Sequence, residues 1–266
     1  MNERPVAFIT GAARGIGRAT AIEFARRGHD VALLDILPDD LLAAAEAVRR
    51  EGAEALTHEV DLADLAAAEA AVRDTAARCG RIDVMVNNAA WRELATMDRI
   101  SLASWERTLR VSLTAPAFLS RWAAEPMSRQ GKGVIINVSS IMSRRGSGNA
   151  PAYVAAKGGL DALTYELAAL YGPAGIRVLA VNPGAVDTEL SRDYRSGVDS
   201  TGASITDKLR AWSEDHIPLG RWAVPEEIAR AIVMLAGDDA RYMTGTTITI
   251  DGGWSTSHLP HSLKRP

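Results

Sequence analysis

Seven short apolar or β-branched runs recur along the chain, separated by stretches with helical periodicity. They are VAFI (6–9), VALL (31–34), ALTHEV (55–60), VMV (84–86), VIINV (134–138), IRVLAV (176–181) and TTITI (246–250). The stretches between them, such as DDLLAAAEAVRR (39–50), repeat apolar residues at intervals of three and four. Strands without polar alternation that are separated by helices predict a parallel sheet covered on both faces. We therefore expect an α/β fold with a doubly wound sheet of about seven strands.

Nothing in the sequence indicates a second domain. No long linker, repeat or low-complexity tract interrupts the chain, so we expect one domain over residues 1–266. Residues 189–216 break the rhythm with a polar insert after the sixth strand, which we interpret as a lid over a site. The tail 256–266 either packs on a neighbouring subunit or lacks order. Its His258 and His261 predict no metal site, because no matched carboxylate or cysteine cluster accompanies them.

Composition excludes several classes of function. The net charge of −3 gives no signature of polyanion binding, so we expect no nucleic-acid partner. The single cysteine, Cys79, cannot form an internal disulfide, which fits a reducing compartment. The N-terminal MNERPVAFITGAARG lacks the pattern of a signal peptide, and no apolar run is long enough to span a membrane. These features favour a cytoplasmic protein without a membrane partner.

A glycine-rich turn, TGAARGIG, follows the first predicted strand and opens a helix. Its spacing is G-x-x-x-G-x-G rather than G-x-G-x-x-G, but strand, turn and helix have the order of a dinucleotide site. Glycines there permit a tight turn and close approach of a pyrophosphate, which the helix N-terminus favours. The candidate cofactor-binding residues of this turn are Gly11, Arg14, Gly15, Ile16 and Gly17.

Asp35 ends the second predicted strand, 18 residues beyond Gly17. A carboxylate at that point can accept both ribose hydroxyls of an adenosine, and it repels a 2′-phosphate. Ile36 supplies no cation for such a phosphate, whereas Arg14 is able to. We therefore expect NAD as the cofactor in preference to NADP.

Three polar residues, Ser140, Tyr153 and Lys157, are candidates for catalysis. The fifth predicted strand runs directly into Ser140, and its carboxyl end lies on the same sheet edge as the glycine turn. Tyr153 follows 13 residues later, in APAYVAAKGGL. The alanines and Pro151 predict a helix there, which places Tyr153 and Lys157 one turn apart on the same face.

The order of these motifs resembles that of the short-chain dehydrogenase/reductase family. The resemblance extends from Val6 to about Ser255, and it implies a Rossmann fold and an oxidoreductase that interconverts a secondary alcohol and its carbonyl. The motifs that carry it are TGAARGIG, NNAA (87–90), Ser140, the Tyr153/Lys157 pair and NPGAVDT (182–188).

The resemblance also implies catalytic roles. A phenol with a pKa near 10 is a poor base at neutral pH, but the Lys157 ammonium and a cationic nicotinamide favour the phenolate. Tyr153 would then take the hydroxyl proton during oxidation and return it during reduction. By the same resemblance Lys157 also holds the nicotinamide ribose hydroxyls, and Ser140 orients the substrate oxygen.

Further cofactor contacts follow only from the resemblance. Asp61 and the adjacent Leu62 would meet the adenine, and Asn88 the adenosine side of the cleft. Val186 and Thr188 would fix the carboxamide and a phosphate.

One position departs from the family pattern. The family usually carries an asparagine in the helix before the fifth strand, where it holds a water that connects the lysine to solvent. In this chain the matching residue of RTLRVSLTAPAF is Ser112. A serine either binds that water, as our hypothesis of a working enzyme requires, or bonds a carbonyl within its own helix. Ala90 also replaces a common glycine, which we expect to be tolerated.

The substrate end is less defined. Segments expected to border the cleft carry Arg92, Arg144, Arg145, Arg192 and Arg195, with Trp91 and Tyr194 as candidate apolar walls. This polar rim favours a small polar or anionic alcohol, such as a sugar or polyol.

Two alternatives remain open. The first is a 3-oxoacyl carrier-protein reductase, although Asp35 disfavours NADPH and Ala174 stands where such enzymes tend to carry a basic residue. The second is a nucleotide-binding sensor without useful turnover, which only Ser112 favours. The resemblance finally implies a homotetramer, assembled through the helices that carry Ser112 and Tyr153 and through the last strand.

Overall fold

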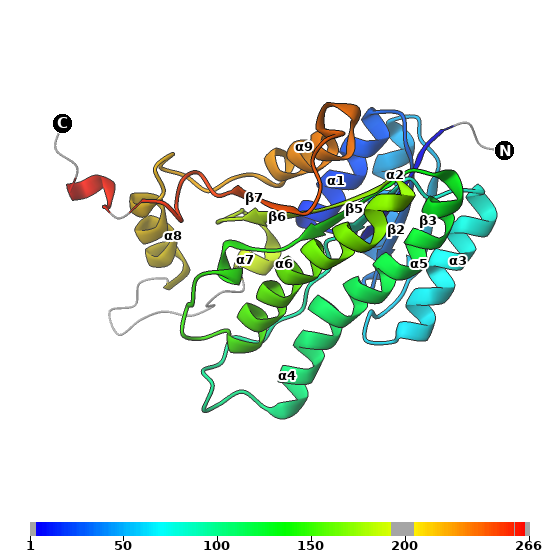
Figure 1. Ribbon diagram of the computed structural model, residues 1–266. Helices are drawn as coiled ribbons and strands as arrows, with labels where there is room; N and C mark the ends of the chain where they lie inside the picture. The colour runs from blue at the N-terminus through cyan, green and yellow to red at the C-terminus, as the bar shows by residue number, and fades with distance from the viewer. Residues whose placement is uncertain (1–3, 193–204, 258, 264–266) are drawn as a thin grey trace.

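The strands of the protein form one parallel sheet, seen obliquely in Figure 1. The computed structural model describes residues 4–192, 205–257 and 259–263. Within these residues seven strands pair in the order β3-β2-β1-β4-β5-β6-β7, all parallel. They are β1 (Val6–Thr10), β2 (Asp30–Asp35), β3 (Ala55–Glu59), β4 (Val84–Asn87), β5 (Gly133–Val138), β6 (Ile176–Pro183) and β7 (Thr246–Ile250). The predicted α/β fold class is confirmed.

Helices connect the strands as the periodicity predicts. The α-helices of the described residues are α1 (Gly15–Arg26), α2 (Pro38–Arg50), α3 (Leu65–Cys79), α4 (Leu102–Leu109), α5 (Ala115–Gln130), α6 (Pro151–Tyr171), α7 (Glu189–Arg192), α8 (Ile205–His216) and α9 (Pro225–Ala236). A π-helical segment, η1 (Arg110–Thr114), joins α4 to α5, and short 3₁₀ turns include η2 (Ile141–Ser143) and η6 (His261–Leu263). The predicted helix around Tyr153 is present, and Pro151 is its first residue, where a missing N–H costs nothing.

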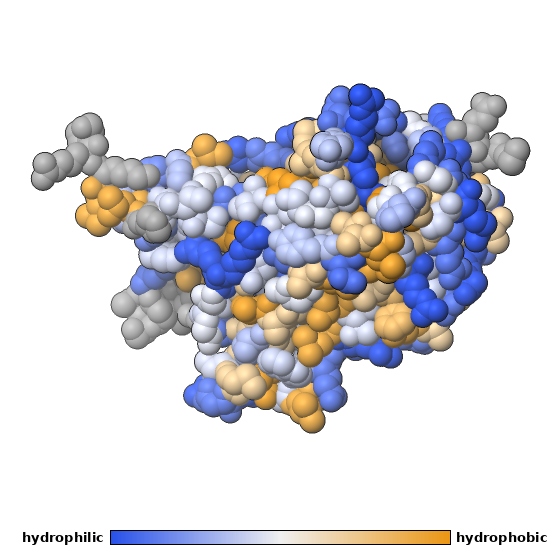
Figure 2. All heavy atoms as spheres, in the orientation of Figure 1, coloured by the Kyte–Doolittle hydropathy of each residue, from blue (hydrophilic) through white to orange (hydrophobic). Residues whose placement is uncertain are grey.

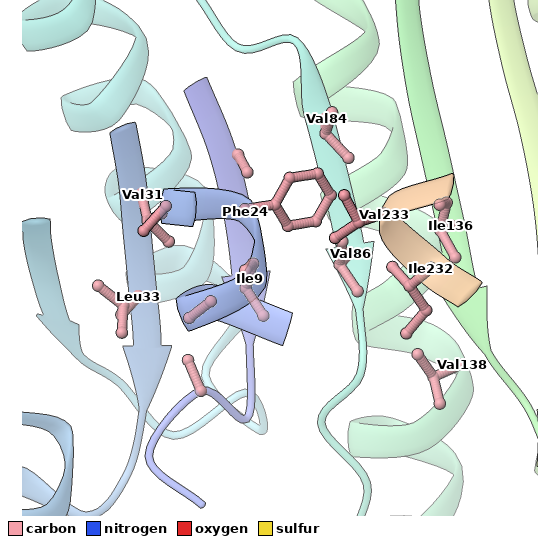
Figure 3. Packing of buried hydrophobic residues seen from close by; sticks show 14 of the residues in the cluster. Ile9, Phe24, Val31, Leu33, Val84, Val86, Ile136, Val138, Ile232 and Val233 are labelled. Carbon is pink, nitrogen blue, oxygen red and sulfur yellow. The ribbon is translucent and has the colours of Figure 1, made fainter. Parts of the chain in front are cut away.

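The five central strands of the sheet, β2, β1, β4, β5 and β6, are buried on both faces. Helices α1, α2 and α9 pack on one face, where Phe24 of α1 and Ile232 of α9 lie over strand residues such as Val86 (Figure 3). Helices α3, α5 and α6 cover the other face, with residues such as Leu119 of α5. Successive strand residues point to opposite faces, so both must be apolar. This double burial explains why the strands show no polar alternation.

The strand order reverses between β1 and β4. From β1 the chain builds outward to β2 and β3, and it then returns to add β4 to β7 on the other side. Such a switch leaves a crevice beyond the carboxyl ends of the strands. A cleft of about 720 Å³ opens there, lined by the segments that follow β1, β4, β5 and β6.

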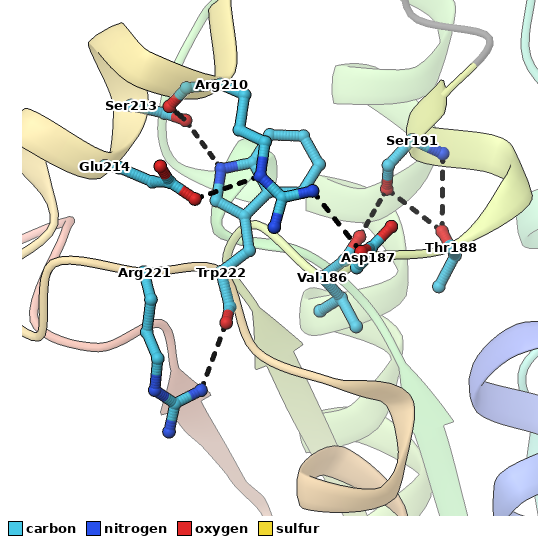
Figure 4. A network of polar contacts seen from close by, with 9 residues as sticks. All are labelled: Val186, Asp187, Thr188, Ser191, Arg210, Ser213, Glu214, Arg221 and Trp222. Carbon is cyan, nitrogen blue, oxygen red and sulfur yellow. Dashed lines mark hydrogen bonds and ion pairs between the residues drawn. The ribbon is translucent and has the colours of Figure 1, made fainter. Parts of the chain in front are cut away.

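The polar insert borders this cleft. Its described part holds α7 and α8, and Leu209 and Trp212 of α8 line the cleft. Arg210 of α8 binds Asp187 at 3.3 Å, and the indole N–H of Trp222 donates to Ser213 at 2.6 Å (Figure 4). These contacts fix α8 to the segments after β6 and before α9. Residues 193–204 of the insert, with Tyr194 and Arg195, lie outside the described residues, as does the side chain of Arg192.

The described part of the tail packs on α8 of its own chain. The His261 ring bonds the carbonyl of Ile217 at 2.7 Å, and both the N–H and the hydroxyl of Ser262 donate to Asp215 at 2.8 Å. Residue His258 lies outside the described residues. In the part of the chain that the structure describes, no helix is both long and apolar enough for a membrane span, and no group of three His, Cys, Asp or Glu side chains is placed to hold a metal.

Candidate active site

The glycine turn wraps tightly between β1 and α1. Gly11 and Gly15 have φ angles of 64° and 52°, in the left-handed region that favours glycine. A Cβ atom on Gly17 would lie 2.0 Å from the carbonyl oxygen of Gly11, so no larger residue fits without moving the turn. The sequence therefore needs glycine at all three positions for the backbone to close.

The start of α1 fits the pyrophosphate of a dinucleotide. Arg14 precedes the helix, and its side chain makes no capping hydrogen bond to the first turn. The leading N–H groups of a helix without such a cap point outward and carry partial positive charge. Gly11, Gly15 and Ile16 line the cleft beside them. The chemistry of this cradle fits an anionic ligand.

Asp35 is tied to the glycine turn. Its carboxylate accepts hydrogen bonds from the backbone N–H of Ala13 at 2.9 Å, of Ile36 at 2.8 Å and of Leu37 at 3.2 Å. The carboxylate thus stands beside the turn at the carboxyl end of β2. Asp35 does not itself line the cleft, although its neighbour Leu37 does.

Arg14 lines the cleft, and its side chain is bound to α2. Its guanidinium binds the carboxylate of Asp40, with Nε donating at 2.8 Å and Nη2 at 2.5 Å. Asp40 lies in the first turn of α2. The cation nearest the end of β2 in the predicted site is thereby paired with a carboxylate.

Asn88 links β4 to the same turn. Its side-chain amide donates to the carbonyl oxygens of Thr10 at 2.9 Å and Gly11 at 3.0 Å. Its backbone N–H binds the Thr10 hydroxyl at 3.0 Å. The resemblance implies that Asn88 contacts the adenosine side of the cofactor. In the structure its amide holds the glycine turn, and the residue also lines the cleft.

Tyr153 and Lys157 lie together on the cleft-facing side of α6. The Lys157 ammonium nitrogen is 5.5 Å from the centroid of the Tyr153 ring. Both side chains are buried, with relative exposures of 8% for Tyr153 and 2% for Lys157, and both line the cleft. Arg92, from the segment after β4, places its guanidinium carbon 5.6 Å from the same ring. Two cations therefore border the Tyr153 ring.

The Lys157 ammonium group is almost completely buried from solvent. Burial lowers the pKa of Lys157 to about 8, the charge of Asp161 opposes that shift and the charge of Arg92 adds to it. At neutral pH the lysine therefore keeps its charge, and it begins to lose the charge just above.

Ser140 stands at the end of β5 and lines the cleft with Tyr153. Its hydroxyl oxygen accepts the N–H of Met142 at 3.1 Å, which caps the turn η2. The preceding Ser139 is buried, and its hydroxyl donates to the carbonyl of Lys157 at 3.2 Å. That contact joins the strand end to α6 at the level of the lysine. The structure thus brings Ser140, Tyr153 and Lys157 to one cleft.

Asp61 and Leu62 lie outside the lining of the cleft. The carboxylate of Asp61 accepts the N–H of Ala63 and a guanidinium N–H of Arg107, both at 2.9 Å. Burial alone would raise the pKa of this carboxyl, but these two contacts outweigh burial and lower it. Leu62 is buried in the hydrophobic core against α3 and α5.

Ser112 is fully buried in the π-helical segment η1 and does not line the cleft. Its hydroxyl accepts the N–H of Trp91 and donates to the carbonyl of Trp91, both at 3.1 Å. The Ser112 hydroxyl thus bonds the segment after β4 and not a carbonyl of its own helix. A π turn widens the helix by one residue, which brings this short side chain to the segment after β4.

Val186 and Thr188 line the cleft beyond β6. The Thr188 hydroxyl lies 2.9 Å from that of Ser191, which donates to the carbonyl of Val186 at 2.6 Å (Figure 4). A Cβ atom added to Gly15 would come within 3.2 Å of the Thr188 methyl group. Thr188 therefore faces the glycine turn across the cleft.

The arginines of the predicted rim separate into two groups. Arg92 and Arg145 line the cleft. Arg144 instead donates to the hydroxyls of Thr247 at 2.6 Å and Tyr165 at 3.3 Å, away from the cleft lining. Trp91 does not line the cleft either, and its ring stacks with Arg107 at 5.5 Å.

Most of the apolar residues that line the substrate end of the cleft were not predicted from the sequence. Trp212, Trp222 and Trp254 line the cleft together with Met142. The rings of Trp212 and Trp254 are 6.3 Å apart, and the Arg145 guanidinium lies 5.6 Å from the Trp254 ring. These three tryptophans lie at separate positions of the chain, so no local sequence pattern predicts that they meet. This end of the cleft is therefore more apolar than the sequence indicated.

The chain matches known proteins over most of its length. A family model described as "Enoyl-(Acyl carrier protein) reductase" matches residues 11–255. The chain is 39% identical over 253 residues to cis-4-hydroxycyclohexanecarboxylate dehydrogenase of Sinomonas cyclohexanicum, covering 94% of this chain and 96% of that protein.

Two solved structures share the whole fold. Levodione reductase superposes with a TM-score of 0.89 at 32% identity, covering 96% of this chain and 98% of that one. A putative NAD(P)-dependent gluconate 5-dehydrogenase from Beutenbergia cavernae, with bound NADP at low occupancy, gives 0.88 at 36% identity, covering 95% and 97%.

Proposed function

Since the chain belongs to the short-chain dehydrogenase/reductase family, we propose that it interconverts a secondary alcohol and its carbonyl compound, with NAD as cofactor and Tyr153 as general acid and base. The observation that carries the proposal is the meeting of Ser140, Tyr153 and Lys157 in a cleft that begins at a dinucleotide-type glycine turn. A dehydrogenase and a reductase that each match nearly the whole chain support this reaction class.

The chain's own residues divide the chemistry among them. The Lys157 ammonium and the Arg92 guanidinium beside the Tyr153 ring favour the phenolate, which takes the hydroxyl proton in oxidation and returns it in reduction. Ser140, in the same cleft, orients the substrate oxygen toward Tyr153. A bound nicotinamide supplies the hydride acceptor or donor when the substrate carbon reacts.

The arrangement at the end of β2 supports NAD. The Asp35 carboxylate beside the glycine turn suits ribose hydroxyls and repels a 2′-phosphate. Asp40 already pairs with Arg14, which reduces what this arginine offers to such a phosphate. The NADP in the Beutenbergia cavernae relative makes the preference a point that experiment must decide. Around the rest of the dinucleotide, we propose Gly11, Gly15, Ile16 and Gly17 at the pyrophosphate, Asn88, Asp61 and Leu62 on the adenosine side, and Val186 and Thr188 near the nicotinamide.

The substrate end favours a compact alcohol with an apolar body and an anionic group. Three tryptophans supply apolar faces, and Arg145 sits over Trp254 at the edge of the cleft. A ring-bearing hydroxy acid, such as the substrate named for the Sinomonas relative, satisfies both features. Sugars and polyols, the class that the polar rim favours, satisfy the polar feature only.

The test is NADH formation across a substrate panel. Cyclic hydroxy acids, their methyl esters, polyols and sugars are offered with NAD⁺ and separately with NADP⁺, to wild type and to Tyr153→Phe. We expect turnover with NAD⁺, highest for the cyclic hydroxy acids and lost in Tyr153→Phe. Turnover that survives in Tyr153→Phe would refute the role of this residue.

The same experiment separates the two alternatives. Strong NADPH-dependent reduction of acetoacetyl thioesters would favour the carrier-protein reductase. NADH binding without turnover on any alcohol or carbonyl would favour the sensor. Ala174 packs against the core and offers no basic side chain to an acidic carrier protein.

We also propose assembly into a homotetramer. Apolar residues gather on the surface formed by α5 and α6 (Figure 2), and Phe118 and Leu170 are exposed there. Contiguous apolar patches on a soluble protein mark interaction sites. Light scattering coupled to size exclusion measures the assembly directly, and a monomer would contradict the proposal.

A further inference from the structure

A buried carboxylate that the proposed mechanism does not use lies one turn beyond the lysine. Tyr153, Lys157 and Asp161 follow each other on α6 at intervals of four residues, so they share one helix face. The Asp161 side chain is 6% exposed, and α6 packs with this face on β5, β6 and η2. Burying a charged carboxylate is costly unless partners compensate it, so this position calls for a reason.

Asp161 is hydrogen-bonded to the end of β6. Its Oδ2 accepts the side-chain amide of Asn182 at 2.9 Å. The same amide nitrogen lies 3.0 Å from the hydroxyl of Ser143 and 3.2 Å from the carbonyl of Ser140. One amide thus ties the carboxylate on α6 to both ends of the short turn that begins at Ser140.

Asp161 is also the anionic group that acts on Lys157. Among the described residues, the charges that act on the lysine come from Asp161 on α6 itself and from Arg92 in the segment after β4. The titratable Tyr153 also faces it, with its ring centroid 5.5 Å from the ammonium nitrogen. Arg92 disfavours the ammonium form of Lys157, as burial does, and Asp161 favours it. The neighbours of Asp161 at β6 and η2, Asn182 and Ser143, are neutral. Asp161 therefore supports the buried ammonium through its charge, beside the hydrogen bond that the ammonium donates to the carbonyl of Val138 at 2.7 Å.

We propose that Asp161 is a positioning residue for the reaction, which holds Ser140 in register with Tyr153 through Asn182 and keeps Lys157 protonated as its buried counter-ion. The inference rests on the proposed function, because it assigns Asp161 to the same proton transfer. Asp161 contacts neither substrate nor cofactor in this role and acts only through its neighbours.

The pH profile of kcat/KM in Asp161→Asn tests the charge. The amide oxygen of the new residue can still accept from Asn182, so this change removes the charge and keeps the shape. We expect the alkaline limb of the profile, which reports the loss of the Lys157 proton, to move down by about one pH unit. The variant should then lose about tenfold in kcat/KM at pH values above the wild-type limb and little at pH values below it. Asp161→Glu restores the charge and should restore the limb. A loss by the same factor at every pH would show that the charge of Asp161 does not keep Lys157 protonated, and it would overturn the proposal.

A double-mutant cycle gives a readout that needs no turnover. The free energy of unfolding is measured for wild type, Asp161→Asn, Lys157→Met and the double variant at pH 7. Asp161→Asn should destabilise the wild-type background more than the Lys157→Met background, because only the former leaves a buried ammonium without its counter-ion. Equal effects in both backgrounds would overturn the inference.

The two measurements also separate this proposal from the function it rests on. A wild type without turnover refutes the proposed function, and the cycle still decides the pairing of Asp161 with Lys157. Normal turnover with an unmoved pH limb refutes only the role of Asp161. If Asp161→Asn does not fold, Asp161→Ser replaces it in both measurements.

Discussion

The ammonium nitrogen of Lys157 donates a hydrogen bond of 2.7 Å to the carbonyl oxygen of Val138, the last residue of β5. This bond fixes the lysine between α6 and the strand that leads into Ser140. Because the hydrogen bond partly replaces lost water, the lysine can stay charged at neutral pH in a site where burial has lowered its pKa to about 8.

Stability should reveal this buried charge through its pH dependence. The unfolded pKa of lysine is about 10.5, so between about pH 8 and 10.5 the unfolded state binds more protons than the folded state. The free energy of unfolding therefore rises with pH over that window, by up to about 3 kcal/mol from this group. Lys157→Met lacks this titrating group. From pH 7 to 10.5 the free energy of unfolding, measured by urea denaturation, should therefore rise more for wild type than for Lys157→Met. Parallel pH curves for the two proteins would contradict the shifted pKa.

Gly17→Ala should disrupt the glycine turn. Its Cβ atom would overlap the carbonyl oxygen of Gly11 at 2.0 Å, so the turn must move. We expect NADH affinity to fall by at least about tenfold, together with a loss of unfolding free energy of about 2 kcal/mol. Fluorescence titration and urea denaturation measure the two effects. Gly172→Ala is the matched control, because a Cβ atom at Gly172 meets nothing within 4 Å. Equal effects of the two substitutions would refute the steric argument.

Asp35 should set the preference between the two cofactors. Asp35→Ala removes the acceptor for ribose hydroxyls and the repulsion of a 2′-phosphate, so the ratio of kcat/KM for NAD⁺ over NADP⁺ should fall by about tenfold or more. Asp40→Ala is an informative partner, because it releases Arg14 from its ion pair. That change should raise kcat/KM for NADP⁺ a few-fold and leave kcat/KM for NAD⁺ nearly unaltered. An unchanged ratio in Asp35→Ala would exclude this role for Asp35.

Ser112 should matter for stability through Trp91. Ser112→Ala leaves the N–H and carbonyl of Trp91 without the hydroxyl that binds both, at a cost of about 1–3 kcal/mol of unfolding free energy. Ser128→Ala, at an exposed position of α5, should change it by less than about 0.5 kcal/mol. Chemical denaturation of both variants checks the difference.

The relay hypothesis for Ser112 has its own variant. The amide of Ser112→Asn offers both a donor and an acceptor to Trp91, so we expect the fold to survive. A large gain in turnover would show that the native relay is impaired, and no change would show that the family's amide is dispensable.

Local patterns in the sequence predicted the sheet and the chemical centre. The apolar run of β5 indicates a strand that is buried on both faces. The spacing of Tyr153 and Lys157 depends on the helical period of 3.6 residues. Short stretches express both features by themselves. The glycine turn was equally readable, because backbone closure at Gly17 demands a residue without a side chain. These features needed no knowledge of the rest of the chain.

Tertiary structure alone decided the surroundings of that centre. Trp212 and Trp254 meet from segments some forty residues apart, Arg145 lines the cleft while the adjacent Arg144 does not, and Asp161 finds its partner at Asn182 on another element. Contacts of this kind depend on strand register and on which helix faces which strand, and these are fixed only when the whole core packs. The sequence by itself therefore determined the strands, the glycine turn and the spacing of the candidate catalytic residues, and the packed fold determined what surrounds, charges and orients those residues.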